Sequence, residues 1–284
     1  MLRKAGTDMN PYNHLSLTRF AATMANLMKI EKPACADAPI DWVCEVMSDL
    51  CKEGFDRFLI HNPDAMGMFL YEKYPDIFEP VLKHTQITIP FKTVMPSVTP
   101  VCFGTMYTGA LPAVHGIQKY EKPVIKIDTL FDALIRAGKK VAILATIRSS
   151  MSMIFQERDM DIIICDTEPN LVDKAQELIL EDKYDLLCVY TVRYDTKEHD
   201  FGPESKEALA AAYQEGRIFD QLVSTVKRNW THHNTLISFS PDHGAHFEET
   251  GEITARGYPL RGDHGSDIPE DLNILHYMGV VRRK

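Results

Sequence analysis

The segment from Val141 to Tyr190 decides the fold class. It contains the apolar runs Val141-Ala-Ile-Leu, Ile162-Ile-Ile-Cys and Leu186-Leu-Cys-Val-Tyr, and an amphipathic stretch over 170–180 separates the last two. Short apolar runs that alternate with helical patterns of this length are typical of βαβ units, whose parallel strands are buried on both faces. The segment therefore predicts a mostly parallel sheet covered by helices.

The same texture extends in both directions along the chain. Further apolar runs are Phe58-Leu-Ile, Ile125-Lys-Ile and Leu236-Ile-Ser-Phe, and helical patterns cover 129–137 and 206–230. Towards the N-terminus, helices are predicted over about 15–28 and 41–52. We expect one α/β domain over residues 1–284, a three-layer α/β/α structure, with an N-terminal helical segment at about 11–53 packed on it.

Composition excludes several classes of protein. The 284 residues are 45% hydrophobic and 25% charged, which argues against disordered, collagen-like and coiled-coil chains. A net charge of −9 argues against a nucleic-acid duplex as the main partner. The sequence has no apolar run long enough to span a membrane, no apolar run after its basic N-terminus, and six cysteines without CxxC spacing. A cytoplasmic protein with reduced thiols and no membrane contact is expected; no oligomeric state is predicted.

Three apolar runs lead to an aspartate. Phe58-Leu-Ile leads to Asp64, the run from Leu186 leads to Asp195, and Leu236-Ile-Ser-Phe leads to Asp242. The carboxyl ends of parallel strands open onto one crevice, where ligands bind in α/β proteins. Three carboxylates at one edge would repel each other unless a positive charge lay between them.

Histidines accompany these carboxylates. His199 follows Asp195 by four residues, His243 follows Asp242, and His264 lies between glycines in Arg261-Gly-Asp-His-Gly. Three Asp and three His suit Zn²⁺, with Mn²⁺ or Fe possible, and six ligands suit two ions rather than one. Taken singly, each has an ordinary alternative: Asp64 as a turn or cap residue, Asp195 with His199 as a solvated pair, Asp242-His243-Gly as a tight turn. Six further histidines are predicted to be surface or core residues: His61, His84, His232, His233, His246 and His276. Of these, His246 is also a candidate neighbour of the site.

A candidate nucleophile lies between Met95 and Ile117. Ser97 and Thr99 stand beside prolines in a turn that could open a helix, whose first N–H groups favour an anionic ligand. The turn-rich sequence Thr108-Gly-Ala-Leu-Pro-Ala-Val-His-Gly-Ile would end that helix. The segment resembles the nucleophile region of the alkaline phosphatase superfamily, in the branch of type I phosphodiesterases and nucleotide pyrophosphatases. In that branch a Thr or Ser stands nine residues before such a Thr-Gly element, the spacing of Thr99 but not of Ser97.

Four further motifs follow the family's order over roughly 55–275. They are Asp64 in Asn-Pro-Asp, the element Asp195-x-x-x-His199-x-x-Gly-Pro, the element Asp242-His243-Gly, and Asp263-His264-Gly. The resemblance implies an alkaline-phosphatase-like fold. It also implies one metal ion on Asp195, His199 and His264, and a second on Asp64, Asp242, His243 and the Thr99 oxygen.

The implied activity is hydrolysis of a small phosphorylated substrate, a diester or a nucleotide-like pyrophosphate. Thr99 would attack phosphorus, form a phosphothreonine intermediate and be released by water, with two divalent ions, Zn²⁺ or else Mn²⁺, as cofactors. The alternatives are a phosphonate or phosphomonoester hydrolase on the same site, and a non-catalytic descendant that binds a phosphorylated ligand. The Cys/Ser-x-Pro-x-Arg signature of sulfatases is missing after Thr99.

Substrate-binding residues are less evident. Cys102 stands where family phosphodiesterases usually carry an Asn, whose amide helps to hold a phosphoryl oxygen; a thiol is a much weaker donor. Arg256, Tyr258 and Arg261 are candidates for contact with a charged or aromatic group of the substrate. They lie in one of two predicted insertions, 69–95 and 245–261, and ordinary loop residues are the alternative there.

Overall fold

A seven-stranded sheet forms the centre of the computed structural model, which describes residues 15–284. The strand order is β2-β9-β6-β1-β5-β3-β4. The strands are β1 (Arg57–Pro63), β2 (Ile87–Lys92), β3 (Val141–Thr146), β4 (Asp161–Cys165), β5 (Leu186–Thr191), β6 (Thr235–Phe239) and β9 (Asn273–Val281). The pairs β1–β5, β1–β6, β3–β5 and β3–β4 are parallel, and only β9 runs antiparallel to its two neighbours. The predicted α/β class with a mostly parallel sheet is confirmed.

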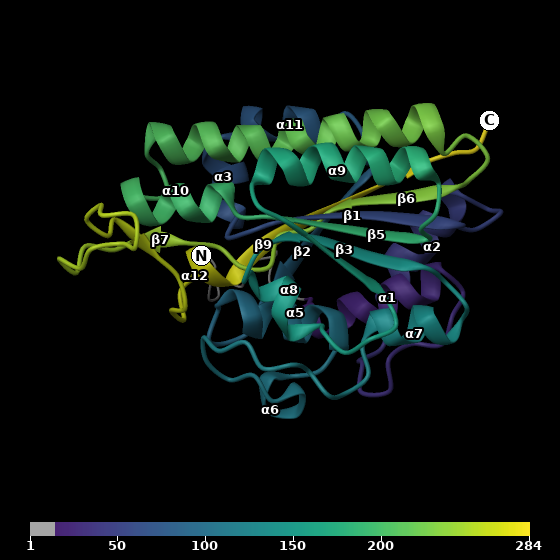
Figure 1. Ribbon diagram of the computed structural model, residues 1–284, viewed down its shortest axis with the longest axis horizontal. Helices are drawn as coiled ribbons and strands as arrows, with labels where there is room; N and C mark the ends of the chain where they lie inside the picture. The colour runs from purple at the N-terminus through teal and green to yellow at the C-terminus, as the bar shows by residue number, and fades with distance from the viewer. Residues whose placement is uncertain (1–14) are drawn as a thin grey trace, which may run out of the picture.

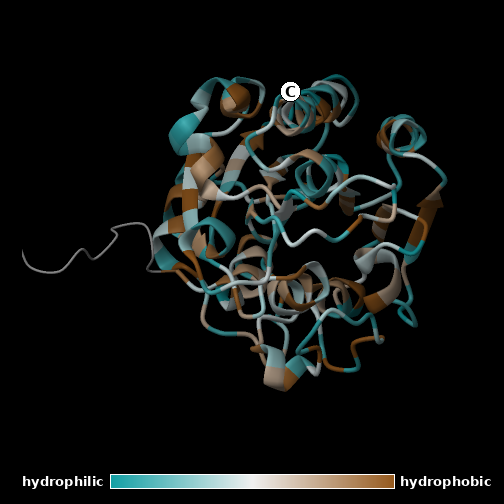
Figure 2. Ribbon diagram, turned by 90° about the vertical axis from the view of Figure 1, so that its left-hand side faces the viewer, coloured by the Kyte–Doolittle hydropathy of each residue, from teal (hydrophilic) through white to brown (hydrophobic). Residues whose placement is uncertain are grey.

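Helices cover both faces of this sheet (Figure 1). One layer contains α3 (Met68–Lys73), α4 (Glu79–Leu82), α9 (Glu168–Glu181), α10 (Arg193–Phe201) and α11 (Lys206–Asn229). The other contains α1 (Phe20–Leu27), α5 (Thr99–Thr108), α6 (Pro112–His115), α7 (Leu130–Arg136) and α8 (Ser150–Ile154), with α2 (Asp41–Leu50) towards the far end of the strands. Figure 2 looks along the strands and shows the three layers end-on.

The central strands are apolar on both faces because each face meets a helical layer. Along β1, Phe58 and Ile60 belong to the core cluster that includes α1 and α5, while Leu59 belongs to the cluster that includes α9 and α11. Successive side chains of a strand point to opposite faces, so an unbroken apolar run is what a doubly covered sheet requires. This explains why unbroken apolar runs, rather than an alternating pattern, mark the parallel strands of this sheet.

The predicted strand at Ile125-Lys-Ile is wrong. Residues 125–127 have no regular structure, although the Ile125 side chain is buried. The Ile125 N–H donates to the Ile154 carbonyl at 2.8 Å, and the carbonyls of Ile125 and Ile127 accept from the Arg158 guanidinium at 2.9 and 3.2 Å. A side chain and a helix end thus satisfy this backbone in place of a neighbouring strand.

Two strands of the seven-stranded sheet escaped prediction, and both lie on its antiparallel side. The β2 strand contains Pro90, which is tolerated because β2 is an edge strand. The β9 run contains His276 and Gly279, and a Cβ at Gly279 would lie 2.3 Å from the His84 carbonyl oxygen. The predicted insertion 69–95 belongs to the main fold. It contains most of α3, then η2 (Pro75–Phe78), α4 and β2.

The N-terminal helices lie against the layer that holds α5. A 3₁₀ turn, η1 (Leu17–Arg19), leads into α1, which contacts α2, α5 and α7. Residues 11–14 of the predicted helical segment lie outside the described residues. Within 15–284, none of the helices has the length and apolarity needed to cross a bilayer.

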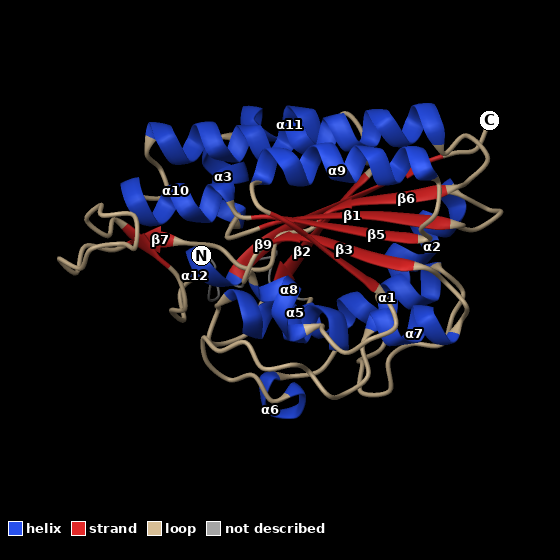
Figure 3. Ribbon diagram, viewed as in Figure 1, coloured by secondary structure: helices blue, strands red, loops and turns tan. Residues whose placement is uncertain are grey.

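A segment also leaves the sheet at its carboxyl edge. It runs from β7 (His246–Phe247) to β8 (Gly262–Asp263), which pair with each other, and it projects beyond the main body in Figure 3. A short helix, α12 (Pro269–Leu272), then leads into β9. This excursion contains the second predicted insertion and delivers His264 back to the strand ends.

Arg158 offers a test of how the 125–127 segment is held. Its side chain is 6% exposed and also pairs with Asp132 at 2.9 Å. We expect Arg158→Met to lower the free energy of unfolding by about 2–4 kcal/mol, since hydrogen bonds to a charged group contribute about 1.5–3 kcal/mol each and their effects overlap. Arg136→Met, which removes a half-exposed ion pair with Asp128, should cost about 1 kcal/mol or less. Urea denaturation of both variants measures the difference, and equal losses would contradict this account.

Candidate active site

Three carboxylates meet at the carboxyl ends of three neighbouring strands. Asp64 follows β1 directly, Asp195 lies in the first turn of α10 after β5, and Asp242 follows β6 by three residues. The β1 strand lies between β5 and β6, and the Asp64 N–H donates to the Thr191 carbonyl at 2.9 Å. Adjacent parallel strands thus bring together residues far apart in the sequence.

The six side chains singled out from the sequence form two groups. Asp64, Asp242 and His243 make up one, and Asp195, His199 and His264 belong to the other, with candidate ligand atoms within 4.8 Å of one another in each group. Glu198, which the sequence analysis missed, joins the second group. The two groups adjoin, because the rings of His243 and His264 have centroids 4.2 Å apart.

All three histidines are oriented in the same way. Each places Nδ1 against a backbone carbonyl: His199 at 2.8 Å from Gly262, His243 at 2.9 Å from Gly244, and His264 at 3.2 Å from Ser97. Each turns Nε2 towards a carboxylate. The His199 and His264 Nε2 atoms lie 3.3 and 3.5 Å from Asp195 Oδ1, and the His243 Nε2 atom lies 3.4 Å from both Asp64 Oδ1 and Asp242 Oδ2. A backbone acceptor at one ring nitrogen fixes the tautomer that leaves the other free as a ligand.

The carboxylate oxygens that face these nitrogens have no hydrogen-bond partner. Within the described chain, Asp64 Oδ1, Asp195 Oδ1 and Asp242 Oδ2 are buried and unsatisfied. An unpaired buried carboxylate is costly, and a divalent cation between the oxygens and the Nε2 atoms would satisfy both. The donor set therefore fits two metal ions, one in each group.

The electrostatics of the two groups differ. Burial raises the pKa of Asp64 and Asp242 well above their usual range, and the charges of Asp242 and Asp195 raise the pKa of Asp64 further. Burial also lowers the pKa of His243. In the other group the interaction with Asp195 outweighs burial and raises the pKa of His199 to about 10. A bound cation would oppose the raised pKa of Asp64, Asp242 and His199, because it favours ionised carboxylates and neutral imidazoles.

Thr99 stands beside the Asp64 group. It is the first residue of α5, its Oγ1 lies 3.3 Å from His243 Nε2, and it lines the cavity over the site. Ser97 has a different role. Its hydroxyl accepts from the Gly265 N–H at 3.1 Å, which holds the His264 loop against the start of α5. The structure thus separates the two hydroxyl candidates: Thr99 faces the site and Ser97 supports it.

A cavity of about 410 Å³ opens above the two groups. Asp64, Thr99, Asp195, His199 and His264 line one side of it. The remaining wall includes Tyr120, Lys122 and Arg148, which the sequence analysis missed. Lys122 Nζ lies 5.2 Å from the Tyr120 ring centroid and donates to the Arg148 carbonyl at 3.0 Å. These residues lie on irregular segments, where no periodicity marks a functional side chain.

Two further residues support the site. The Tyr190 hydroxyl, at the end of β5, donates to Asp64 Oδ2. Asp271 accepts from His246 Nδ1 and from the Ser266 N–H, both at 2.8 Å. His246 therefore lies beside the site, as an anchor of the loop that carries His264.

The structure places the four predicted substrate-binding residues outside the cavity lining. Cys102 is fully buried in the first turn of α5, where burial raises the pKa of its thiol. Arg256 pairs with Asp200 at 2.6 Å, and the Tyr258 ring packs 5.0 Å from that of Phe201. The Arg261 side chain pairs with Glu249. Contacts with α10 thus engage Arg256 and Tyr258, and an ion pair within the 245–261 excursion engages Arg261.

The other histidines are core or surface residues, as predicted. His61 and His276 are buried and bonded at 2.8 Å to Thr191 and to the Pro241 carbonyl, and His84 binds Asp220 at 2.8 Å. His232 is exposed, and His233 lies 3.5 Å from Asp182.

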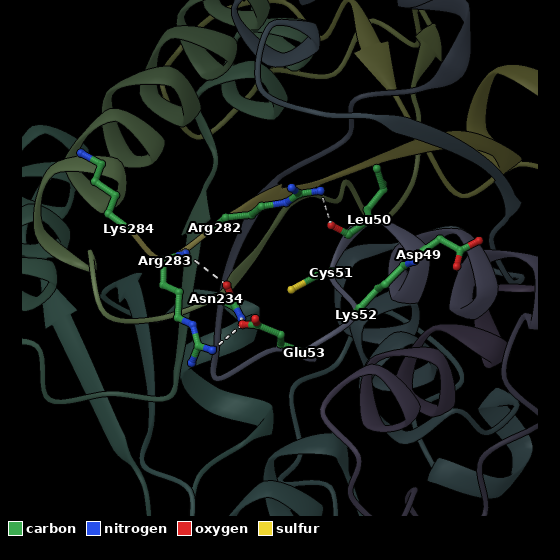
Figure 4. Close-up of a pocket in the computed structure, with 9 residues that line it drawn as sticks. All are labelled: Asp49, Leu50, Cys51, Lys52, Glu53, Asn234, Arg282, Arg283 and Lys284. Carbon is green, nitrogen blue, oxygen red and sulfur yellow. Dashed lines mark hydrogen bonds and ion pairs between the residues drawn. The ribbon is translucent and has the colours of Figure 1, made fainter.

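A second hollow, of about 500 Å³, lies beside the C-terminal residues (Figure 4). Its lining includes two arginines whose charged groups are engaged: Arg282 donates to the Leu50 carbonyl and Arg283 pairs with Glu53. The Cys51 thiol is buried and bonded to the Gly54 carbonyl. These contacts bring together no ligand set comparable to the two groups at the strand ends.

Several solved structures have a fold similar to that of this chain. The chain matches murine ectonucleotide pyrophosphatase/phosphodiesterase 5, an inactive variant in complex with AMP, with a TM-score of 0.60 at 14% identity, covering 79% of this chain and 88% of that one. The human protein of that name gives 0.60 at 13% identity, covering 79% and 87%. Phosphonoacetate hydrolase from Sinorhizobium meliloti, in complex with phosphonoformate, gives 0.50 at 18% identity, covering 72% and 60%. A search of curated proteins found no match.

The family comparison covers the centre of the site. The model of the type I phosphodiesterase/nucleotide pyrophosphatase family matches residues 127–256, a range that contains Asp195, His199, Asp242 and His243. Over these residues the chain is therefore similar to type I phosphodiesterases and nucleotide pyrophosphatases, and its fold is similar to that of the solved structures above.

Proposed function

We propose that this chain hydrolyses a small phosphorylated substrate with Thr99 as nucleophile and two divalent ions, Zn²⁺ or else Mn²⁺, as cofactors. One observation carries the proposal: three buried carboxylate oxygens that lack partners in the described chain face three histidine Nε2 atoms, and that of His243 lies 3.3 Å from the Thr99 hydroxyl. Mixed carboxylate and imidazole donors favour Zn²⁺ over harder ions such as Mg²⁺.

The residues divide between the two ions as follows. Asp64, Asp242 and His243, with the Thr99 oxygen beside them, would hold one ion, and Asp195, His199 and His264 would hold the other. When bound, such ions lower the pKa of a hydroxyl group and neutralise charge on a phosphoryl group.

The covalent steps involve Thr99. Its Oγ1 forms a bond to phosphorus while the bond from phosphorus to the leaving-group oxygen breaks. Water then cleaves the phosphothreonine ester, which releases the phosphorylated product and restores the hydroxyl. Backbone donors at the start of α5 offer little help, because Pro100 has no N–H and the N–H groups of Val101 and Cys102 donate to the Val98 carbonyl.

A phosphonate substrate is the second candidate. Among residues 15–284, neither the Lys122 ammonium nor the Arg148 guanidinium forms an ion pair with a carboxylate, and both residues line the cavity. A cationic wall suits a substrate with a second anionic group, either a carboxylate or another phosphate. The resemblance to the fold of a phosphonoacetate hydrolase agrees with a carboxylate as the second group.

The non-catalytic alternative is disfavoured because the candidate nucleophile Thr99 is present at the site. The cytoplasmic location stays a prediction.

The nucleophile is tested by substitution at Thr99. Thr99→Ala should lower kcat by more than about a thousandfold, as loss of a covalent nucleophile does. Thr99→Ser should retain turnover, because it keeps the hydroxyl. Intact-mass spectrometry of acid-quenched reactions should show a phosphorylated wild-type protein and an unmodified Thr99→Ala protein. Wild-type turnover by Thr99→Ala would rule out the covalent step.

Metal dependence is tested by removal and return. Prolonged chelation should abolish turnover of bis-p-nitrophenyl phosphate, and Zn²⁺ or Mn²⁺ should restore it as elemental analysis approaches two ions per chain. Circular dichroism before and after chelation serves as the control for folding. Full turnover by protein that holds only trace metal would contradict the proposal.

Lys122 distinguishes substrates by charge. Lys122→Met should raise KM about tenfold for a substrate with a second anionic group, such as phosphonoacetate or a nucleoside diphosphate, since a charged hydrogen bond contributes about 1.5–3 kcal/mol and this one is partly exposed. The KM for bis-p-nitrophenyl phosphate should stay unchanged. Lys119→Met is the matched control, because that lysine is exposed, pairs with Glu121 and does not line the cavity. Equal effects on both substrate classes would contradict the role of Lys122.

A further inference from the structure

Glu198 is a buried carboxylate that takes no part in the proposed covalent steps. It lies on α10 between Asp195 and His199, and its side chain is fully buried. In the described part of the chain, both of its carboxylate oxygens lack a hydrogen-bond partner. A solitary buried carboxylate costs several kcal/mol unless a positive charge or donor compensates for it.

The histidine that follows Glu198 in the sequence lies beside its carboxylate. Glu198 Oε1 lies 3.2 Å from His199 Nδ1, while His199 Nε2 lies 3.3 Å from Asp195 Oδ1. The imidazole thus has a carboxylate at each ring nitrogen. The hydrogen bond of Nδ1 goes to the Gly262 carbonyl at 2.8 Å, so the Glu198 carboxylate acts on the ring as a neighbouring charge.

Close packing keeps Glu198 in this position. A Cβ added at Gly262 on β8 would lie 2.2 Å from Glu198 Oε2 and 2.5 Å from the Glu198 carbonyl oxygen. Only a glycine allows the β8 backbone to approach α10 so closely. The same backbone therefore supplies the carbonyl for His199 and confines the Glu198 carboxylate beside the ring.

We propose that Glu198 is a positioning residue for metal binding: it acts on the Nδ1 side of His199 and so strengthens the hold of Nε2 on a divalent ion shared with Asp195 and His264. The inference rests on the proposed two-metal function. Histidine ligands in metal sites commonly donate their second N–H to a carboxylate or carbonyl, which orients the ring and raises its basicity.

Glu198 adds a fourth carboxylate to the charge balance of the site. When two divalent ions are bound, the ionised forms of Asp64, Asp195, Asp242 and Glu198 would supply four negative charges, which equal the four positive charges of the ions. With three carboxylates, one positive charge would remain to attract the substrate. With four, attraction of an anionic substrate falls to Lys122 and Arg148 on the cavity wall.

The test is the affinity for Zn²⁺, measured by competition with a chromophoric chelator. Glu198→Gln keeps the shape of the side chain and removes its charge, so one of the two ions should bind about 10–100-fold more weakly while the other is unaffected. Glu198→Met, which removes the polar atoms as well, should give a loss at the upper end of this range. Metal-free Glu198→Gln should melt no lower than the wild-type protein, because an uncompensated buried charge has been removed.

Glu215→Gln is the matched control. Glu215 is equally buried and also has one unpartnered oxygen, but it contacts Thr191 and His61 and belongs to neither metal group. Its substitution should leave both Zn²⁺ affinities within about twofold of the wild type, below the 10–100-fold loss expected for an outer partner of a metal ligand. If both ions bind Glu198→Gln and Glu198→Met as tightly as the wild-type protein, Glu198 has no positioning role. A folded wild-type protein that binds no Zn²⁺ would overturn the two-metal function itself, which is a separate result.

Discussion

Repulsion among carboxylates at the ends of β5, β1 and β6 is the constraint on which the site depends. Asp64, Asp195 and Asp242 are buried together, and an oxygen of each lacks a hydrogen-bond partner in the described chain. For Asp64 and Asp242 folding alone does not compensate for this cost, because burial and the neighbouring carboxylates raise the pKa of both side chains. Asp195 differs, because His199 and His264 lower the pKa of its carboxyl group. Two divalent ions would turn the same arrangement into a stabilising one and would couple metal binding to the stability of the strand ends.

The rest of the structure orients the partners of these carboxylates. Three histidines from α10, from the end of β6 and from the β8 loop each use Nδ1 on a backbone carbonyl and turn Nε2 inward. Ser97 and Asp271 anchor the His264 loop, and Tyr190 binds the second oxygen of Asp64. Backbone acceptors make the ring orientations a property of the fold rather than of mobile side chains.

The sequence predicted the parallel half of the fold and the centre of the site for the same reason. A buried parallel strand is an unbroken apolar run, and the residue that ends it is a polar residue whose place in space follows from the topology. The antiparallel strands β2 and β9 escaped because Pro90, His276 and Gly279 interrupt their patterns. The strand predicted at 125–127 was wrong because a buried Ile125 and a partly buried Ile127 do not reveal that Arg158 satisfies the backbone there. Tyr120, Lys122, Arg148 and Glu198 escaped because their roles depend on tertiary contacts. The sequence also did not reveal the ion pairs that hold Arg256 and Arg261 away from the cavity.

The most direct test of the two-metal site is anomalous X-ray diffraction from crystals of the zinc-loaded protein, recorded on both sides of the zinc absorption edge. We expect two peaks per chain, one in contact with Asp64 Oδ1, Asp242 Oδ2 and His243 Nε2, the other with Asp195 Oδ1, His199 Nε2 and His264 Nε2. A map without zinc at these positions, with the three carboxylate oxygens still unpartnered, would contradict the central claim.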